Sequence, residues 1–187
     1  MKRFFIVCLS LLLAGQAEAQ LKAASFKKLQ EFLPATAPKD FVASKPTGQT
    51  SSQMGMSQSW SEIRFTKNIK KKDDSGNEYS TEDASVSVKI NDYIMMSMAL
   101  SMYQMQGDFE NETENGYEKS VKVLGKFSGK EEFSKSDDSK RAKLSFAVGN
   151  RFLVEMEAQG NVDAALLHAV AKSMPLDSLE KAAGELK

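Results

Sequence analysis

Alternating apolar and polar positions predict a long hairpin in the first half of the chain. Apolar residues occupy every second position from Ala84 to Ile90, which is the period of a strand with one buried face. The Ser-, Gln- and Thr-rich segment 49–68 predicts an extended partner, with a bulge near Trp60 and Ile63 where the alternation drifts. The charged run 70–78 predicts the polar turn that joins the two strands.

Further short strands are predicted in the second half of the chain. They cover residues 117–127, 131–136, 142–148 and 151–159. The last two strands carry apolar residues at alternate positions, and Gly149-Asn150 between them predicts a two-residue hairpin turn. The polar and acidic stretch 108–116, which precedes these strands, predicts a loop.

Two helices are predicted before and between these groups of strands. Residues 21–33 have apolar side chains at helical spacing, and Pro34 and Pro38 end that helix and begin a meandering connection. Residues 93–106 contain no charged residue, Gly or Pro, which predicts a second helix, and Asp92 is its expected N-cap. The second helix is rich in methionine.

Helices are also predicted at the C-terminus. Asn161 or Asp163 caps a helix over 164–174, Pro175 breaks it, and a short amphipathic helix runs from Asp177 to Lys187. Strands grouped together, with helices at the ends and one between, predict an α+β fold. We therefore expect an antiparallel sheet of hairpins with an N-terminal helix, a Met-rich middle helix and C-terminal helices. One sheet face is expected to be covered by helices.

Residues 1–19 predict a cleavable secretory signal. Met1-Lys2-Arg3 is basic, residues 4–14 are apolar except for Ser10, and Ala17-Glu18-Ala19 is a small-x-small cleavage motif. The apolar run is shorter than the ~20 residues that cross a bilayer. The expected organisation is a signal peptide (1–19), an N-terminal helix and Pro-containing connection (20–48), and a single α+β domain (49–187).

The position of the one cysteine and the balance of charge indicate the expected compartment and exclude one class of partner. The only cysteine, Cys8, lies inside the apolar run, and Gln16 follows Leu13-Ala14-Gly15 where a lipoprotein signal requires Cys. We therefore expect a periplasmic or secreted protein without disulfides, lipid anchor or membrane span after cleavage. The chain has 25 basic and 25 acidic residues, and this balance argues against nucleic acid as a partner.

Catalytic and metal motifs receive little support from the residue pattern. His168 is the only histidine, and no Ser or Asp partner adjoins it on the predicted helix, so a structural role is expected. The acidic turns 73–78 and 137–139 lack the alternating ligands of a calcium loop. We expect a protein that is not an enzyme and carries no cofactor.

Methionine is the unusual component, with ten residues in the chain. Five lie within the predicted middle helix, and Met54 and Met56 precede it. Core packing is the expected role, because methionine fills irregular gaps. One alternative is a groove for a protein partner or small hydrophobic ligand, contacted by Trp60, Met95, Met98, Met102 and Tyr103. A second is a thioether site for copper, with ligands Met95, Met98, Met102 and Met105.

The C-terminal half resembles a group of exported bacterial proteins of unassigned function. The similar segments are Gly116–Val123, Phe127–Phe133, Leu144–Val148, Arg151–Met156, Asn161–Asp163 and Pro175–Asp177. The architecture is similar to the PsbP-like α/β/α sandwich, and the resemblance implies a leading helix, a sheet of long hairpins and a closing helix. It also implies a binding, assembly or accessory role, and it supplies no site residues.

Overall fold

The computed structural model describes residues 22–94, 97–105, 107–136 and 139–185, without the side chains of residues 97, 99, 102 and 103. The strands are β1 (Val42–Ala43), β2 (Thr47–Gln53), β3 (Met56–Lys72), β4 (Glu78–Asp92), β5 (Glu110–Thr113), β6 (Gly116–Val123), β7 (Phe127–Lys135), β8 (Lys140–Val148) and β9 (Phe152–Gly160). The helices are α1 (Phe26–Gln30), α2 (Ser97–Gln104), α3 (Ala164–Lys172) and α4 (Leu176–Glu185).

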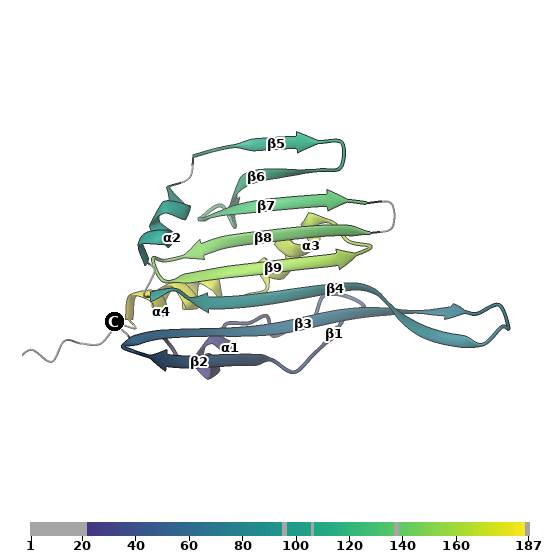
Figure 1. Cartoon of the computed structure of the whole chain (residues 1–187), viewed down its shortest axis with the longest axis horizontal. Helices are drawn as coiled ribbons and strands as arrows, with labels where there is room; N and C mark the ends of the chain where they lie inside the picture. Colours follow the sequence, from purple (N-terminus) through teal and green to yellow (C-terminus); the bar gives the residue numbers. More distant parts are fainter. Residues whose placement is uncertain (1–21, 95–96, 106, 137–138, 186–187) are drawn as a thin grey trace, which may run out of the picture.

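The strands form one antiparallel sheet, which confirms the expected sheet-rich α+β class. Its order is β1-β3-β4-β9-β8-β7-β6-β5, and β2 also pairs with β3, beside β1. Each neighbouring pair is antiparallel. β4 pairs with β9 only over Ala84–Asp92, so the far ends of β3 and β4 project beyond the sheet as a two-stranded ribbon (Figure 1).

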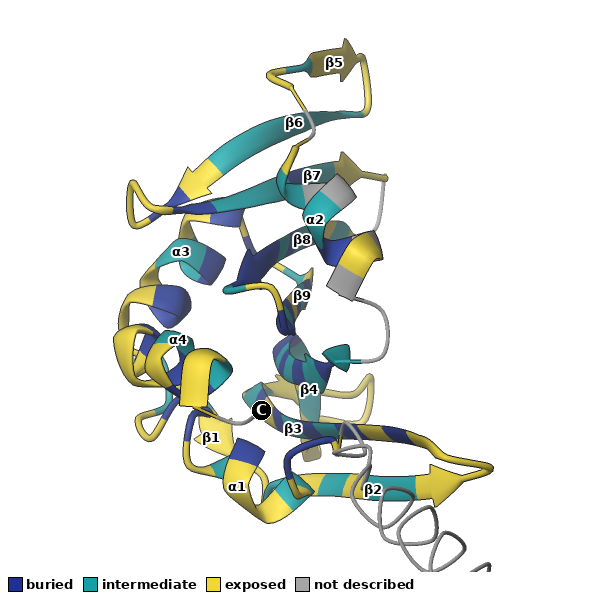
Figure 2. Cartoon of the chain, turned by 90° about the vertical axis from the view of Figure 1, so that its left-hand side faces the viewer, coloured by how far each residue is buried: buried dark blue, intermediate teal, exposed yellow. Residues whose placement is uncertain are grey.

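The two faces of the sheet differ in their cover. Figure 2 shows α1, α3 and α4 along one face, which we call the helix-covered face. α2 lies on the opposite side, near one end of β7 and β8. The described residues leave most of that side, which we call the open face, uncovered. Neighbouring residues of a strand point to opposite faces, which places Trp60, Lys89, Glu155 and Lys143 on the open face, between buried neighbours.

The hydrophobic core lies between the helix-covered face and its helices. Phe65, Phe146 and Phe152 are fully buried on the sheet side, and Leu167 of α3 and Leu179 of α4 are fully buried opposite them. These residues occupy the alternating and helical positions that the sequence pattern marks as apolar. Burial of these side chains, each contributing about 1.5–3 kcal/mol, explains why the strands adopt a single register.

The first predicted hairpin partner differs from the structure. Residues 49–68 do not form one extended segment, because Met54 and Gly55 have φ values of 52° and 78°. This left-handed backbone makes a two-residue turn and divides the segment into β2 and β3. The strand thus reverses at Met54, where the sequence predicts continued alternation.

In the second half of the chain, a turn, a loop and a strand end also differ from the prediction. Val148 pairs directly with Phe152, so the turn contains three residues, Gly149 to Arg151, rather than two. The stretch 108–116, predicted as a loop, contains the short strand β5. The predicted strand 117–127 ends at Val123, because a turn at residues 124–126 separates β6 from β7.

The helix boundaries are partly as predicted. Asp163 is the N-cap of α3, and its carboxylate accepts a hydrogen bond from the Leu166 N–H at 3.1 Å. Pro175 separates α3 from α4. The N-terminal helix is shorter than predicted and begins only after the cap residue Ser25. Asp92 ends β4, and its Oδ1 accepts a hydrogen bond from the Ile94 N–H at 3.1 Å as a cap does, but α2 begins only at Ser97. The same buried carboxylate pairs with an arginine in the turn before β9.

None of the helices within the described ranges combines the length and the apolar character that a membrane crossing requires.

Candidate functional site

A groove of about 590 Å³ lies on the open face, where β2, β3 and β4 run side by side. Met56 and Trp60 line it from β3, Lys89 from β4, and Tyr93 from the residue that follows β4. The alternation of β3 produces this arrangement, because Ser57, Ser59 and Ser61 point to the helix-covered face and are buried there. We refer to this hollow as the groove.

Trp60 and Lys89 are in direct contact within the groove. The Lys89 ammonium lies 5.0 Å from the centroid of the indole ring, a cation–π contact worth about 0.5–1 kcal/mol at a partly exposed site. Lys89 lies between Glu62 and Glu155 in the cross-strand register. Among the residues that the structure describes, it forms an ion pair with neither of them. The Lys89 ammonium is therefore not held by either carboxylate and can turn toward the groove, which it lines.

Tyr93 and Asn91 add polar groups to the same wall. Burial, followed by the negative charge of Glu155, raises the pKa of the Tyr93 phenol above its ordinary value. The phenol therefore stays protonated at neutral pH and can donate a hydrogen bond. The Asn91 amide of β4 donates a hydrogen bond to the Glu155 carboxylate of β9 at 2.6 Å.

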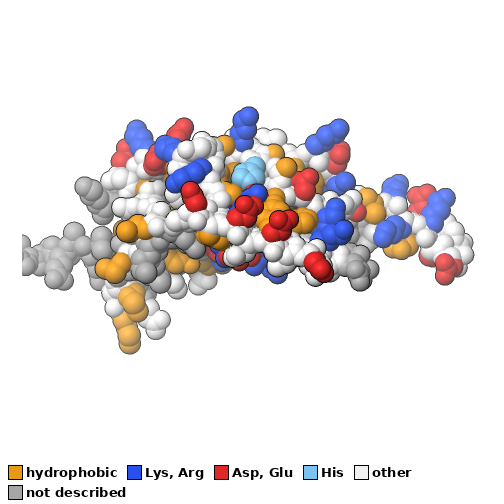
Figure 3. Space-filling view, turned by 90° about the horizontal axis from the view of Figure 1, so that it is seen from above, with side chains coloured by type: hydrophobic (Ala, Val, Ile, Leu, Met, Phe, Trp, Pro, Cys, Tyr) orange, Lys and Arg blue, Asp and Glu red, His pale blue; other side chains and the backbone are white. Residues whose placement is uncertain are grey.

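Four exposed methionines lie outside the core, and one of them, Met56, lines the groove. Met54 lies in the β2–β3 turn and Met56 begins β3, with 92% and 62% of their surface exposed. Met98 of α2 and Met105, which follows it, are 79% and 82% exposed. Both the turn and α2 lie at the same end of the sheet (Figure 1), and Figure 3 shows apolar side chains projecting at that end. Core packing, the expected role, is therefore wrong for these four residues.

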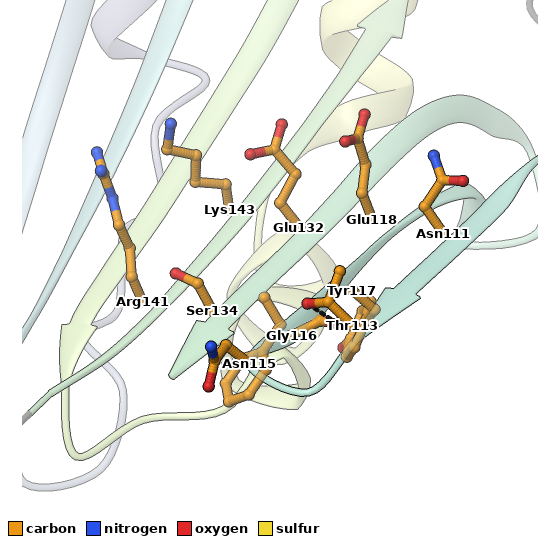
Figure 4. A pocket seen from close by; sticks show the side chains of 11 residues that line it. Asn111, Thr113, Asn115, Gly116, Tyr117, Glu118, Glu132, Ser134, Arg141 and Lys143 are labelled. Atoms are coloured by element: carbon orange, nitrogen blue, oxygen red, sulfur yellow. Dashed lines mark hydrogen bonds between the residues drawn. The ribbon is translucent and has the colours of Figure 1, made fainter. Parts of the chain in front are cut away.

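The rest of the open face carries interspersed charges. Side chains from successive strands point to the same side in Figure 4, including Arg141 and Lys143 of β8 and Glu132 of β7. They line a shallow hollow of about 330 Å³, and Glu132 and Lys143 also line a neighbouring hollow that reaches Lys89. Lys130 bridges Glu118 and Glu132, with the Glu132 contact at 2.9 Å. This part of the face is ion-paired, whereas Lys89 in the groove forms no ion pair with a residue that the structure describes.

A buried carboxylate on the helix-covered face holds a second polar cluster. Glu131 accepts hydrogen bonds from the Tyr117 hydroxyl at 2.7 Å and from His168 Nε2 at 2.5 Å, and Lys119 Nζ lies 3.5 Å away. Burial raises the pKa of Glu131, but the two hydrogen bonds and the lysine charge outweigh burial and lower that pKa. Burial and the bond to Glu131 raise the pKa of Tyr117 to about 12.

This cluster joins α3 to β6 and β7. It assembles an acid, a base and a phenol, but its three groups satisfy one another and the carboxylate is only 5% exposed. The sequence did not reveal it, because His168 finds its partner 37 positions away. Alternation along β7 places Glu131 on the buried face, and this is the one signal that could have indicated its role.

The residues predicted to form a site are only partly brought together. Trp60 lies in the groove, half-buried. Met98 lies on α2 and is exposed, and Met105 follows α2. Met95 lies outside the described residues, and Met102 and Tyr103 belong to α2 with side chains outside the description.

Sequence reasoning missed Lys89, Asn91 and Tyr93 as neighbours of Trp60. The signal was present in the alternation of residues 84–91, which places Lys89 and Asn91 opposite the buried positions. The register that pairs Trp60 with Asn91 could not be read from the sequence.

Within the described ranges, no three His, Cys, Asp or Glu side chains are grouped closely enough to hold a metal ion. The chain matches no protein-family model, no curated protein and no solved structure.

Proposed function

We propose that this protein is a non-enzymatic binding or accessory protein of the bacterial periplasm, and that the groove holds a small amphiphile with an apolar chain and an anionic head. The contact between Trp60 and Lys89 carries the proposal. The indole and the Met56 thioether provide apolar surface, and the lysine provides an ammonium group that forms an ion pair with neither of its cross-strand neighbours, Glu62 and Glu155. A groove of about 590 Å³ is within the usual size of small-molecule sites.

Two features of the sequence support export and an accessory role. The signal-like segment 1–19, which lies outside the described residues, supports export to the periplasm or beyond. The resemblance of the C-terminal half to exported proteins with a PsbP-like sandwich supports an accessory or binding role. In the structure, α2 on the open face and α1, α3 and α4 on the other are compatible with a layered arrangement of this type.

Trp60 fluorescence tests the proposal directly, because Trp60 is the only tryptophan in the chain. The exported protein is titrated with dodecanoate below its micelle concentration, and with the uncharged dodecanol in parallel. We expect a saturable change in emission with dodecanoate. Lys89→Gln should weaken dodecanoate binding about tenfold, the loss of one charge-assisted hydrogen bond, and should leave dodecanol binding unchanged.

Lys122→Gln is the matched control, since Lys122 lies in an exposed position on β6 and outside the groove. It should bind dodecanoate as the parent protein does. An emission spectrum that dodecanoate does not change, or a Lys89→Gln variant that binds both compounds normally, contradicts the proposal.

Copper binding is a second candidate, favoured by the exposed thioethers of Met98 and Met105. Together with Met95 and Met102 they would present soft sulfur ligands, which suit Cu(I). Competition with a coloured Cu(I) chelator measures this binding. Replacing Met95, Met98 and Met102 with Leu should abolish it while preserving the fold, whereas Met54→Leu should not weaken it. Failure of the parent protein to compete for Cu(I) excludes this candidate.

A further inference from the structure

β2 is an edge strand with an unusual lack of charge. Among the strands that the structure describes it pairs only with β3. The stretch from Thr47 to Trp60 contains no charged residue, although charged residues make up 27% of the chain. Natural sheets usually protect their edges with charge, proline or very short strands. The opposite edge follows that rule: β5 has only four residues, and Glu110 and Glu112 are two of them.

The turn geometry identifies which backbone groups of β2 are unpaired. Gln53 pairs with Met56 across the two-residue turn, and the residues that flank such a turn share hydrogen bonds. Hydrogen-bonded pairs alternate along an antiparallel ladder, so the backbone groups of Gly48, Thr50 and Ser52 point away from β3. Among the described residues, no backbone hydrogen bond reaches these outward groups.

We propose that a second copy of this chain occupies this edge, with β2 pairing antiparallel to β2 of the copy. Thr50 lies on the two-fold axis opposite Thr50 of the copy, and Gly48 of each chain faces Ser52 of the other. The three residue pairs form about six N–H···O=C hydrogen bonds. The two nine-stranded sheets become one continuous sheet.

Charge and side-chain size favour a second copy as the occupant. An uncharged strand can pair with itself without repulsion between like charges. Its outward backbone positions carry the small residues Gly, Thr and Ser, and α1 contacts two of them on the helix-covered face, where Phe26 packs on Gly48 and donates its N–H to Thr50 Oγ1 at 2.7 Å. The same register brings the exposed Met54 of one chain toward Pro46 of the other, and so adds an apolar contact at each end.

The symmetry also limits the assembly to two chains. An isologous contact uses the same edge on both copies and closes on itself. Pairing of β2 with β5 of another copy would continue into a fibre, and the carboxylates of Glu110 and Glu112 protect that edge. The interface does not depend on the ligand proposed for the groove.

Sedimentation velocity over a wide range of protein concentration tests the dimer. The exported protein should shift from the mass of one chain toward that of two as its concentration rises. Gln49→Lys places two lysines diagonally across the two-fold axis, and we expect it to weaken dimerisation about tenfold. Asn111→Lys makes the same kind of change at the β5 edge and should have no effect on dimerisation.

A disulfide test checks the register independently. Thr50→Cys in a Cys8→Ser background places two thiols on the axis, where Cα atoms of a hydrogen-bonded pair lie about 5.5 Å apart, within disulfide range. Oxidation should yield a covalent dimer, whereas Asn111→Cys should stay monomeric. A mass of one chain at every concentration, or a dimer that Gln49→Lys does not weaken, overturns the proposal. Circular dichroism of each variant confirms that it is folded.

Discussion

Arg151 and Asp92 form a buried ion pair that joins the end of β4 to the turn before β9. The Arg151 Nη2 atom lies 2.7 Å from Asp92 Oδ2, and Nε donates to both carboxylate oxygens at 3.1 Å. Nη2 also donates to the Lys22 carbonyl at 3.0 Å, and Asp92 Oδ2 accepts from the Ala24 N–H at 2.7 Å. Three distant segments of the chain therefore meet at this pair.

Replacing Asp92 with Asn should destabilise the protein by about 3 kcal/mol, because the Arg151 charge remains buried without a counter-ion. The free energy of unfolding, measured by urea titration, checks this expectation. Glu185→Gln is the control, since the Lys181–Glu185 pair is exposed and its loss should cost less than about 1 kcal/mol. Equal effects of the two substitutions contradict the assigned role of Asp92.

Residues 22–24 should contribute to stability although they form no helix or strand. The Ala23 N–H donates to Ser57 Oγ at 3.1 Å, in addition to the two contacts with the Asp92–Arg151 pair. A chain that begins at Ser25 should lose about 2 kcal/mol, or roughly 4–8 °C in melting temperature. A chain that begins at Lys22 retains all three contacts and should melt as the parent chain does. Equal melting temperatures for the two truncations contradict this prediction.

Tyr117 should make the protein less stable at alkaline pH. Its pKa is raised to about 12 in the folded state, from an ordinary value of 10.0. The unfolded chain therefore loses the phenol proton first, and stability present below pH 10 declines as pH rises toward about 12. Urea midpoints at several pH values should show a smaller alkaline decline for Tyr117→Phe. An unchanged decline indicates that other groups cause it.

Glu131 should make the protein less stable at acid pH, the reverse of the alkaline effect of Tyr117. Glu131 has a lowered pKa in the folded state, so its stabilising effect is present above the ordinary value of 4.5 and declines as pH falls below it. Glu131→Gln should reduce the dependence of the urea midpoint on pH in this range. Glu110→Gln, at an exposed position on β5, should leave that dependence unchanged.

Exposed methionines should be oxidised faster than the methionines buried in the core. Met54, Met98 and Met105 are exposed, whereas Met156 and Met174 are 2% and 6% exposed within the core. Under mild hydrogen peroxide, peptide mass spectrometry should find sulfoxide first at the exposed positions. Denaturant should remove the difference between the two groups. Oxidation of Met156 at the rate of Met98 in the native protein would contradict this assignment.

The strands were predictable where one face is buried. Residues 84–91 and the strands that carry Leu144 and Val154 alternate except at Ser85 and Ala147, because every second side chain must enter the core. The β2–β3 turn was not predictable by the same logic: β2 is mostly exposed, so no apolar period marks where the chain reverses. The local sequence predicts Asp92 as a helix cap, and its Oδ1 does accept from the Ile94 N–H, but its ion pair with the distant Arg151 could not be predicted from local sequence.

The candidate site was likewise predictable only in part. Trp60 was a predicted contact residue, but the groove also needs Lys89 and Tyr93, whose proximity depends on the register of β3 against β4. The predicted site centred on the methionines of the middle helix. The structure instead places the groove along the strands, with the described part of α2 at the same end of the sheet.

Periodicity and turn residues in the sequence by themselves determined the sheet-rich α+β class, the cap of α3 and most of the buried strand positions, because these depend on neighbours within a few residues. Tertiary structure alone decided the partners of Asp92, Glu131 and Trp60, and the exposure of Met98. Those outcomes depend on strand register and on segments distant in the chain, and no local pattern of side chains encodes that spatial order.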